Sequence, residues 1–274
     1  MKKRLDIILC EKGFFQSREL AIAAVMEGIV FVDGQRRDKP GEKIEESLKI
    51  EVRGRNMPYV SRGGFKLEKA LKIFPFDVKE KIIMDIGAST GGFTDCLLQH
   101  GAKKVFAIDV GYGQLAWKLR NDPRVISMER TNFRYLKKKE IEETIDGATI
   151  DVSFISLSII LDNLYDFLGK KGEVIGLIKP QFEAEREKVE EKGVVSNPKV
   201  HIEVLQKMME KMKEKGFYVK GLSFSPITGP QGNIEFLSYL SKEKNEQLPN
   251  VEAEIKRVVQ KAHKELKLFI HREI

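Results

Sequence analysis

A glycine-rich segment followed by a distant acidic residue is the first place in this sequence where chemistry is expected. Residues 87–94 read Gly-Ala-Ser-Thr-Gly-Gly-Phe-Thr and come directly after Met84-Asp85-Ile86. Glycines let a backbone approach a ligand closely, and the start of a following helix offers N–H groups to a carboxylate or phosphate. Asp109 comes about 22 residues after Gly87, where doubly wound folds place an acid that binds an unphosphorylated ribose. The expected cofactor-binding residues are therefore Asp85, Gly87, Ala88, Ser89, Thr90, Gly91, Gly92, Phe93, Thr94 and Asp109.

The spacing of these glycines argues against a nicotinamide or flavin cofactor. The dinucleotide pattern is G-x-G-x-x-G, whereas residues 87–92 give G-x-x-x-G-G. A plain structural interpretation also stays open, in which the glycines only make a tight turn and Asp109 caps a helix.

Short apolar runs separated by helix-sized segments predict the element that carries this loop. The runs cover residues 81–86, 104–109, 148–152 and 174–178. This spacing indicates parallel strands joined by crossover helices, and so an α/β fold. Further along, the patterns predict a helix over 201–215, strands over 217–219 and 234–239, and an amphipathic C-terminal helix with one apolar stripe from Val251 to Phe269.

The first 52 residues predict a separate small α+β module. Two helices come first, the second capped by Ser17 and ending at Gly28, and a hairpin follows through Val30-Phe31-Val32-Asp33-Gly34. Residues 53–64 lack periodicity and are interpreted as a linker. The expected organisation is therefore a module over 1–52, a linker over 53–64, a main domain over 65–241 and a C-terminal helix over 242–274 that packs on the body.

The excess positive charge lies in the N-terminal part of the chain. Residues 1–72 hold 16 Lys and Arg against 11 Asp and Glu, and the remainder holds 32 against 30. A locally basic unit favours contact with a polyanion, although a solvated surface with a slight bias is the alternative. No apolar run approaches the roughly 18 residues of a membrane helix, and Asp6 interrupts any signal-peptide core. We therefore expect a cytoplasmic protein. Cys10 and Cys96 lack metal-ligand spacing, so we expect no metal site.

These segments together resemble a known family of methyltransferases. Residues 85–94 resemble the first motif of class I methyltransferases, in particular the FtsJ-like ribose methyltransferases. Residues 4–52 resemble the alpha-L RNA-binding module of a small-subunit ribosomal protein and of tyrosyl-tRNA synthetase. With Val60-Ser61-Arg62-Gly63-Gly64 and Lys179-Pro180-Gln181-Phe182-Glu183, nearly the whole chain resembles the TlyA family.

This resemblance implies a function, a cofactor and a partner. It implies a Rossmann-like methyltransferase domain that uses S-adenosylmethionine to make 2′-O-methylcytidine in ribosomal RNA, within ribosomal subunits. The expected target is 23S RNA, with 16S RNA as a further one, because the tail after Glu235 resembles the longer branch of the family. The family also carries a haemolysin label, but the sequence contains no span, long amphipathic hairpin or signal peptide that would support it.

The same resemblance implies a catalytic Lys-Asp-Lys-Glu set, which this chain offers in order as Lys66, Asp151, Lys179 and Glu235. Asp151 and Lys179 stand at the ends of expected strands, and Glu235 is expected within the last strand. Ribose methylation needs an oriented hydroxyl and a base for its proton, and it requires no metal. A lysine has an ordinary pKa of about 10.4, so Lys179 could be this base only if burial or Lys66 depressed its pKa.

Further binding residues follow from the resemblance. Asn132 stands where the fold holds an adenine, although an ordinary turn asparagine is the alternative. Arg18 is the expected RNA contact of the module, with Arg4, Arg36, Arg37 and Arg62 as weaker candidates. The main alternative from another class is a non-catalytic RNA-binding or ribosome-assembly factor that retains the fold. The glycine spacing and the RNA-type module disfavour a nicotinamide oxidoreductase, and nothing in the sequence supports a membrane-damaging toxin.

Overall fold

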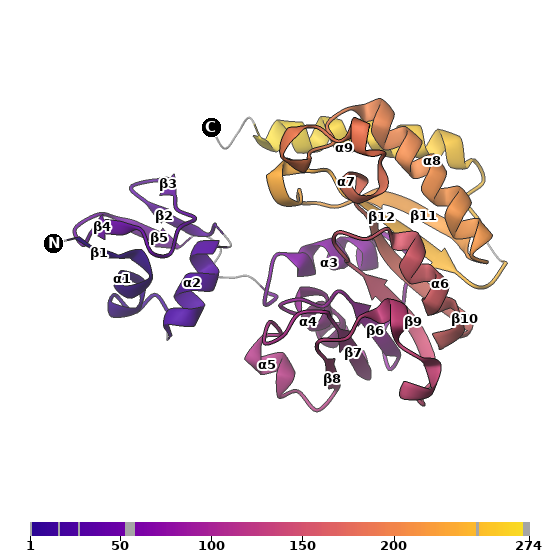
Figure 1. Ribbon diagram of the computed structural model, residues 1–274, viewed down its shortest axis with the longest axis horizontal. Helices are drawn as coiled ribbons and strands as arrows, with labels where there is room; N and C mark the ends of the chain where they lie inside the picture. Colours follow the sequence, from indigo (N-terminus) through magenta and orange to yellow (C-terminus); the bar gives the residue numbers. More distant parts are fainter. Residues whose placement is uncertain (1, 16, 27, 53–57, 245–246, 271–274) are drawn as a thin grey trace. The chain divides into compact units, whose positions relative to one another are not determined.

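The chain folds into two compact units, Met1–Pro58 and Tyr59–Ile274, which are described separately. The computed structural model (Figure 1) describes residues 2–15, 17–26, 28–52, 58–244 and 247–270, with backbone alone for 267–270. Residues 53–57 of the expected linker lie outside the described residues. Among the residues that are described, no helix is both long and apolar enough to cross a membrane.

The smaller unit contains the predicted pair of helices and the predicted hairpin. Leu20 N donates to Ser17 Oγ at 3.3 Å, so Ser17 caps the second helix. The hairpin turn lies at Asp33 and Gly34, both with positive φ, as its tight geometry requires. The bounds are β1 (Lys2–Arg4), α1 (Leu5–Glu11), α2 (Arg18–Met26), β2 (Val30–Val32), β3 (Gln35–Arg36), β4 (Lys43–Glu45) and β5 (Ile50–Val52).

The larger unit is built on one seven-stranded sheet with the order β11-β12-β10-β9-β6-β7-β8. From β10 to β8 the strands are parallel, and β12 runs antiparallel to both β10 and β11. The predicted mostly parallel α/β fold is therefore confirmed. The strand bounds are β6 (Ile82–Ile86), β7 (Lys104–Ile108), β8 (Val125–Met128), β9 (Ile145–Ile150), β10 (Leu168–Ile178), β11 (Tyr218–Phe224) and β12 (Phe236–Ser241).

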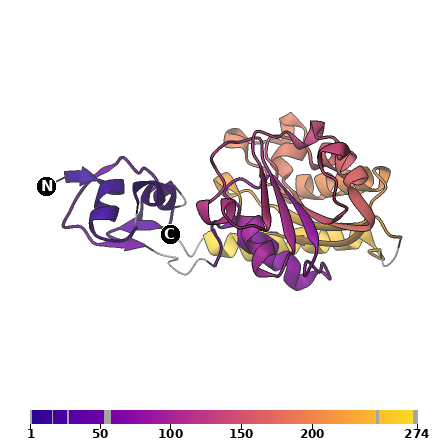
Figure 2. The same ribbon diagram turned by 90° about the horizontal axis from the view of Figure 1, so that it is seen from below.

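Helices cover both faces of this sheet, which explains the apolar runs in its strands (Figure 2). Neighbouring residues of β6 point to opposite faces: Ile83 packs with α3 and α4, and Met84 packs with α6 and α8. The helix bounds are α3 (Gly63–Ile73), α4 (Gly92–Gln99), α5 (Trp117–Arg120), α6 (Leu157–Phe167), α7 (Pro180–Glu183), α8 (Pro198–Glu214) and α9 (Val251–Ile270).

Helix α9 packs along α8 and β11 through its apolar stripe. Ile255, Val258, Ala262 and Leu266 are buried in the main core, whereas the side chain of Phe269 lies outside the described residues. A histidine contact adds to this packing, since His201 Nδ1 on α8 lies 2.9 Å from Nε2 of His263 on α9.

The expected linker extends too far into the larger unit. Tyr59 is 5% exposed and packs in the core of that unit, and α3 already begins at Gly63. A Cβ on Gly64 would lie 2.3 Å from the Tyr59 ring, so this glycine lets the ring pack directly on the helix. The Ser-Arg-Gly-Gly motif therefore belongs to the start of α3 and not to a linker.

Candidate active site

Four charged side chains meet at the carboxyl edge of the parallel strands, and we call them the tetrad: Lys66, Asp151, Lys179 and Glu235. Asp151 directly follows β9 and Lys179 directly follows β10. The expectation that Glu235 lies within the last strand was wrong by one residue, because β12 begins at Phe236. Since β12 is antiparallel to β10 and pairs Phe236 with Ile178, the residue before it reaches the same edge.

Short ion pairs connect the four members. Lys66 Nζ lies 2.7 Å from Glu235 Oε2 and 3.2 Å from Asp151 Oδ2. Lys179 Nζ lies 2.5 Å from the other carboxylate oxygen of Asp151, Oδ1. Asp151 therefore bridges the two lysines, and the predicted set forms one connected network.

Burial and pairing set opposite charge preferences within the tetrad. Burial by itself lowers the pKa of Lys66, but the carboxylates of Asp151 and Glu235 outweigh it and raise that pKa above its ordinary value. For Asp151 burial acts in the opposite direction and raises the pKa, but the charges of Lys66 and Lys179 hold this pKa below its ordinary range. Lys66 is therefore a fixed cation and Asp151 a fixed anion at neutral pH.

The glycine-rich loop lies between β6 and α4, as the sequence predicts. Gly87 and Gly91 have φ of 86° and 94°, and Ser89 has φ of 48°, so the loop uses the left-handed region three times. Ser89 and Thr90 are exposed, whereas Gly91, Gly92, Phe93 and Thr94 are buried against the protein. The exposed residues are the ones that can contact a ligand directly.

Asp109 follows β7 and is held against this loop. Its Oδ2 accepts from Ser89 N at 2.8 Å, and its Oδ1 accepts from Gly111 N at 2.7 Å. Ser89 Oγ in turn donates to Gln114 Oε1 at 3.2 Å. The expected ribose acid is thus fixed in position beside the loop by backbone N–H groups.

Asp85 is fully buried beneath the loop, although the sequence grouped it with the cofactor-binding residues. Burial raises its pKa to about 7, and hydrogen bonds from Thr94 and Thr149 oppose this shift. Thr94 Oγ1 donates to its Oδ2 at 2.6 Å and Thr149 Oγ1 to its Oδ1 at 3.1 Å. This geometry lets Asp85 hold β6, β9 and the start of α4 together.

The loop and the tetrad are directly joined. Asp151 N donates to Ile86 O at 3.0 Å, at the last residue of β6. A Cβ on Gly87 would lie 2.5 Å from the carbonyl oxygen of Asp151, so only glycine allows this approach. A ligand bound on the exposed side of the loop would therefore lie next to the tetrad.

Asn132 caps a short 3-10 helix, Phe133–Tyr135, by accepting from Arg134 N at 3.1 Å. Its side chain is exposed on the segment after β8. The contact fits the ordinary turn asparagine that the sequence left open, and it leaves the adenine role a proposal.

Sequence reasoning missed two residues beside the tetrad. Ser153 Oγ accepts a hydrogen bond from Lys179 Nζ at 3.0 Å. Phe154 is 91% exposed and has φ of 65°, an unusual conformation for a bulky residue. Its ring lies 5.0 Å from that of Phe182 on α7. An exposed aromatic ring held next to a charged site is a surface on which a nucleobase can stack.

The smaller unit presents the predicted RNA contacts Arg4 and Arg18 around one buried acid, Asp6. Arg4 donates to both carboxylate oxygens at 3.0 Å, and Arg18 Nε donates to Oδ2 at 2.9 Å. The hydrogen bond from Arg4, helped by that from Arg18, holds the pKa of Asp6 below its ordinary range. Both arginines are thus oriented while their outer surfaces stay exposed.

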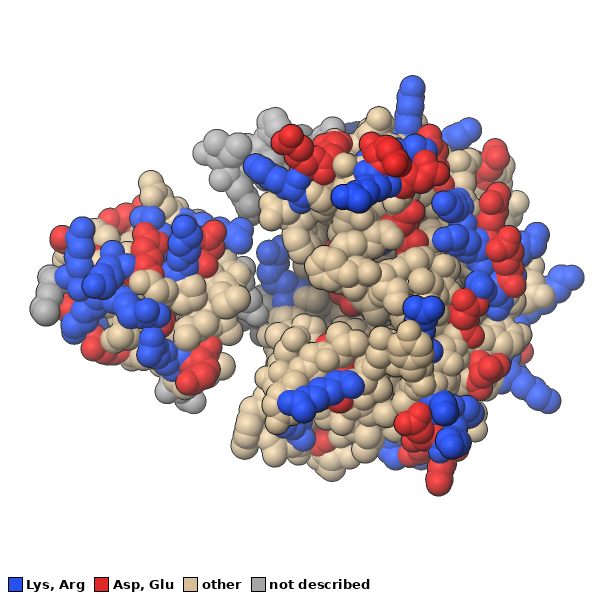
Figure 3. Space-filling view, viewed as in Figure 1, with Lys and Arg blue, Asp and Glu red and all other residues tan. Residues whose placement is uncertain are grey.

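The three weaker arginine candidates lie in different environments. Arg36 is exposed and its guanidinium covers Gly28, where an added Cβ would lie 2.2 Å from Arg36 Nε. Arg37 is half-buried and pairs with Glu42 at 3.1 Å. Arg62 is half-buried at the start of α3, so it belongs to the larger unit. On the face of the smaller unit in Figure 3, Lys and Arg side chains are interspersed with acidic ones.

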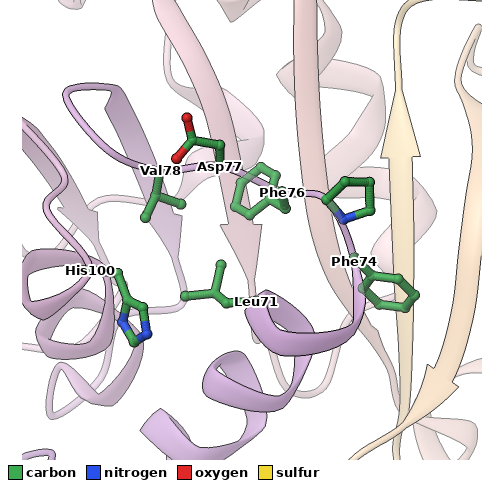
Figure 4. Close-up of a pocket in the computed structure, with 7 residues that line it drawn as sticks. Leu71, Phe74, Phe76, Asp77, Val78 and His100 are labelled. Carbon is green, nitrogen blue, oxygen red and sulfur yellow. The ribbon is translucent and has the colours of Figure 1, made fainter.

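A separate hollow of about 430 Å³ lies away from this chemistry (Figure 4). Leu71, Phe74, Phe76 and Val78 line it, with His100 on one side. These residues precede β6 or end α4, so the hollow lies near the amino ends of the parallel strands. Within the described part of the chain, no group of three His, Cys, Asp or Glu side chains is arranged to hold a metal.

Comparison with known proteins identifies the family. A family described as FtsJ-like methyltransferase matches residues 59–242, and the S4 domain family matches residues 3–50. The 16S/23S rRNA (cytidine-2'-O)-methyltransferase TlyA of Mycobacterium tuberculosis is 39% identical over 240 residues, which cover 87% of this chain and 90% of that protein. The chain belongs to the TlyA family of FtsJ-like methyltransferases.

Two further proteins are similar to this chain along nearly its full length. A Bacillus subtilis protein, provisionally named rRNA methyltransferase YqxC, is 55% identical over 271 residues, or 97% of this chain and 96% of its own. A solved structure from Streptococcus thermophilus, provisionally named a hemolysin, is 49% identical, covers 98% of both chains and has a TM-score of 0.79. The TlyA-family chain is thus a methyltransferase with an S4 domain, as its sequence predicted.

Proposed function

We propose that this protein transfers a methyl group from S-adenosylmethionine to the 2′-hydroxyl of cytidine in ribosomal RNA. The observation that carries the proposal is the junction of loop and tetrad, where Gly87 closely approaches Asp151. A methyl donor and an oxygen nucleophile must meet in line within a few ångströms, and this junction brings their two binding regions together. The name of the M. tuberculosis relative supports cytidine in 23S RNA, and 16S RNA as a further target.

The residues present fit the proposed cofactor. Asp109 is fixed beside the loop, in position to accept the hydroxyls of an unphosphorylated ribose. The exposed Ser89 and Thr90 can contact the rest of the nucleoside, and Asn132 is proposed at the adenine. When bound, S-adenosylmethionine supplies a methyl group that its sulfonium activates, and the carboxylate of Asp151 is the nearby anion that favours this positive charge.

The two lysines of the tetrad are proposed to have different roles in the reaction. Lys66, held as a cation by Glu235 and Asp151, is proposed to orient the ribose oxygen and to stabilise negative charge on it. Lys179 Nζ is proposed to accept the 2′-hydroxyl proton while the oxygen–methyl bond forms and the sulfur–methyl bond breaks. For this step Lys179 must first have released its own proton, and Asp151 and Ser153 then hold the amine in position.

The S4 domain is proposed to dock the RNA before the reaction. Its arginines Arg4 and Arg18 can each give a phosphate the donors that Asp6 does not use. Arg36, Arg37 and Arg62 are proposed as additional contacts, and Phe154 as the surface on which the target base stacks. The partner is ribosomal RNA within ribosomal subunits, which places the reaction in the cytoplasm.

The test uses purified protein, S-adenosylmethionine with a labelled methyl group, and ribosomal subunits from cells that lack this protein. We expect labelled 2′-O-methylcytidine in 23S RNA and also in 16S RNA, located by mapping ribose methylation in both subunits. The absence of label in both RNAs, together with restored ribosome assembly, would instead identify a non-catalytic assembly factor. Label on a base nitrogen or carbon would refute the proposed nucleophile.

A further inference from the structure

Helix α6 begins just after the loop that carries Asp151 and Ser153, and a residue from another segment caps its start. Glu183 is the last residue of α7. Its Oε1 accepts from Leu157 N at 2.7 Å, and its Oε2 accepts from Ser156 Oγ at 2.7 Å. Ser156 Oγ also accepts from Ser158 N at 3.3 Å, so the serine and the glutamate together provide acceptors for the backbone N–H groups in the first turn of α6.

Glu183 is rigidly connected to Lys179. Between them lies the single turn of α7, with Pro180 at its first position. Phe182 N donates to Lys179 O at 2.9 Å, and Ala184 N donates to Pro180 O at 2.9 Å. A shift of the Glu183 carboxylate relative to α6 would therefore also shift the backbone of Lys179.

The two segments meet at three successive places. Lys179 binds Asp151 and Ser153 at the tetrad end, and the Phe154 and Phe182 rings meet in the middle. The cap by Glu183 closes the far end. The backbone between these contacts is strained at Phe154, whose φ is 65°. A strained loop keeps one geometry only if contacts at both of its ends hold it.

The environment of Glu183 also argues for more than a surface cap. Burial raises the pKa of Glu183 above its ordinary value, while the hydrogen bonds from Ser156 and Leu157 oppose the shift. A charge at a helix N-terminus stabilises the helix from an exposed position as well. Glu183 is half-buried, which costs desolvation, and its hydrogen bonds connect the two loops of the tetrad directly.

We infer that Glu183 is a positioning residue for methyl transfer, which fixes the Asp151–Ser156 segment against Lys179 by capping α6 from α7. This inference rests on the proposed methyl transfer. The expected size of the effect follows from geometry, because a displacement of about 1 Å in a catalytic group can lower the rate by about 100-fold.

The test compares Glu183→Ala, Glu183→Gln and the control Glu185→Ala in the full-length protein. Glu185 lies two residues on, exposed, and pairs with Lys188 at 3.3 Å. We measure the single-turnover rate of methyl transfer to ribosomal subunits, the KM for the subunits, and S-adenosylhomocysteine affinity by calorimetry. The calorimetric stoichiometry counts folded sites, so each rate is expressed per site.

Glu183→Ala should lower the rate per site by about 10- to 100-fold, while the KM and the cofactor affinity change by less than about 2-fold. Glu183→Gln should restore the rate to within about 3-fold, because the amide can still accept from Leu157 N and can donate to Ser156 Oγ. Glu185→Ala should match the wild type. If Glu183→Ala does not fold, Ser156→Ala removes one of the two contacts and should lower the rate by about 3- to 10-fold.

Two results would overturn the inference alone. The first is a wild-type rate per site in Glu183→Ala. The second is a fall in rate together with a higher KM and a weaker cofactor affinity that Glu183→Gln does not restore. A wild-type rate in Ser156→Ala would have the same meaning if Glu183→Ala cannot be made. A wild-type protein that transfers no methyl group to ribosomal RNA refutes the proposed function itself, and the inference with it.

Discussion

Each unit of the chain holds a carboxylate that binds two cationic side chains, and the two clusters differ in their access to water. In the smaller unit, Asp6 is fully buried, but the side chains of Arg4 and Arg18 are 42% and 50% exposed. In the tetrad, the two lysine side chains are only 11% and 9% exposed. The exposed arginines can bind a polyanion directly from solution. The lysines of the tetrad can contact only a substrate group that enters the site.

The difference also extends to the type of cation. An arginine keeps donors for a phosphate after it has bound a carboxylate, and it stays charged in any surroundings. A lysine can release its proton, which makes it suitable for chemistry on a hydroxyl. The comparison therefore separates docking from catalysis, and substitutions in the two clusters should change different measurements.

The largest effect is expected at the tetrad, for Lys179→Ala. Methyl transfer should fall by about 10² to 10⁴-fold because the proton acceptor is lost, whereas cofactor and RNA affinities should stay within a few-fold. Labelled methyl transfer and calorimetry measure the two quantities. The control is Lys171→Ala, on the β10 strand that Lys179 directly follows; this side chain is 83% exposed, and the variant should behave like the wild type. Full activity of Lys179→Ala would remove the proposed base.

The second effect concerns folding stability and follows from the pKa of Asp6, which lies below its ordinary range in the folded protein. A lowered folded pKa stabilises the protein above the ordinary value of about 3.9, and this contribution is lost as the pH falls through the folded pKa. Asp6→Asn should therefore be less stable than the wild type by roughly 1 to 3 kcal/mol at pH 7, and this difference should shrink as the pH falls below the ordinary value of about 3.9.

Urea unfolding at several pH values measures this difference. The control is Asp38→Asn, because Asp38 is an exposed residue of the same unit. Its difference in stability from the wild type should not depend on pH in this way. A constant difference between wild type and Asp6→Asn across the whole pH range would mean that the ion pairs with Arg4 and Arg18 do not stabilise the unit.

A smaller effect is expected for RNA binding when Arg18 is changed. Arg18→Ala should weaken RNA affinity by about 1 kcal/mol, roughly 5-fold, and make its salt dependence shallower by about one phosphate contact. Arg18→Lys keeps the charge, so it should keep the slope while losing part of the affinity. Binding titrations at several salt concentrations give both values. An unchanged slope in Arg18→Ala would exclude a phosphate contact.

The smallest effect is expected for Ser153→Ala. Lys179 would lose one hydrogen bond but keep its ion pair with Asp151, so the rate should fall by about 2- to 5-fold. The single-turnover rate at saturating substrate measures this change. A loss as large as that of Lys179→Ala would mean that the serine itself takes part in proton transfer.

The sequence predicted the parts of the molecule that depend on local patterns. The apolar runs gave most of the parallel strands, because each is buried on both faces. Strand β8 was missed, since it lies at the sheet edge and Ile126 and Ser127 are exposed. The separate β1–β4 pair was missed as well, because both strands are short, lie far apart in the sequence and lack a turn motif such as the Asp33-Gly34 that marked the hairpin.

Site residues were predictable where a family motif contains them, and not where only the folded loop creates the contact. All four tetrad members came from the ordered Lys-Asp-Lys-Glu set that the family resemblance implies, and Lys179 also lies within the motif of residues 179–183. Ser153 and Phe154 gave no signal, because their positions depend on a left-handed backbone after Asp151. Glu183 belongs to the motif of residues 179–183, but nothing in the sequence indicated its role, because its partner Leu157 lies 26 residues earlier in the chain. The burial of Asp85 likewise depends on contacts across two strands.

The antiparallel strand β12 has a consequence for the timing of folding. It inserts between β11 and β10, and the residue before it supplies the carboxylate nearest to Lys66. During synthesis the chain emerges from its amino end, so Lys66 can pair with Glu235 only after about 170 further residues have been made. Such long-range pairing is slow to form. The nascent protein can therefore assemble its cofactor loop early, but it becomes an enzyme only when its last strand is in place.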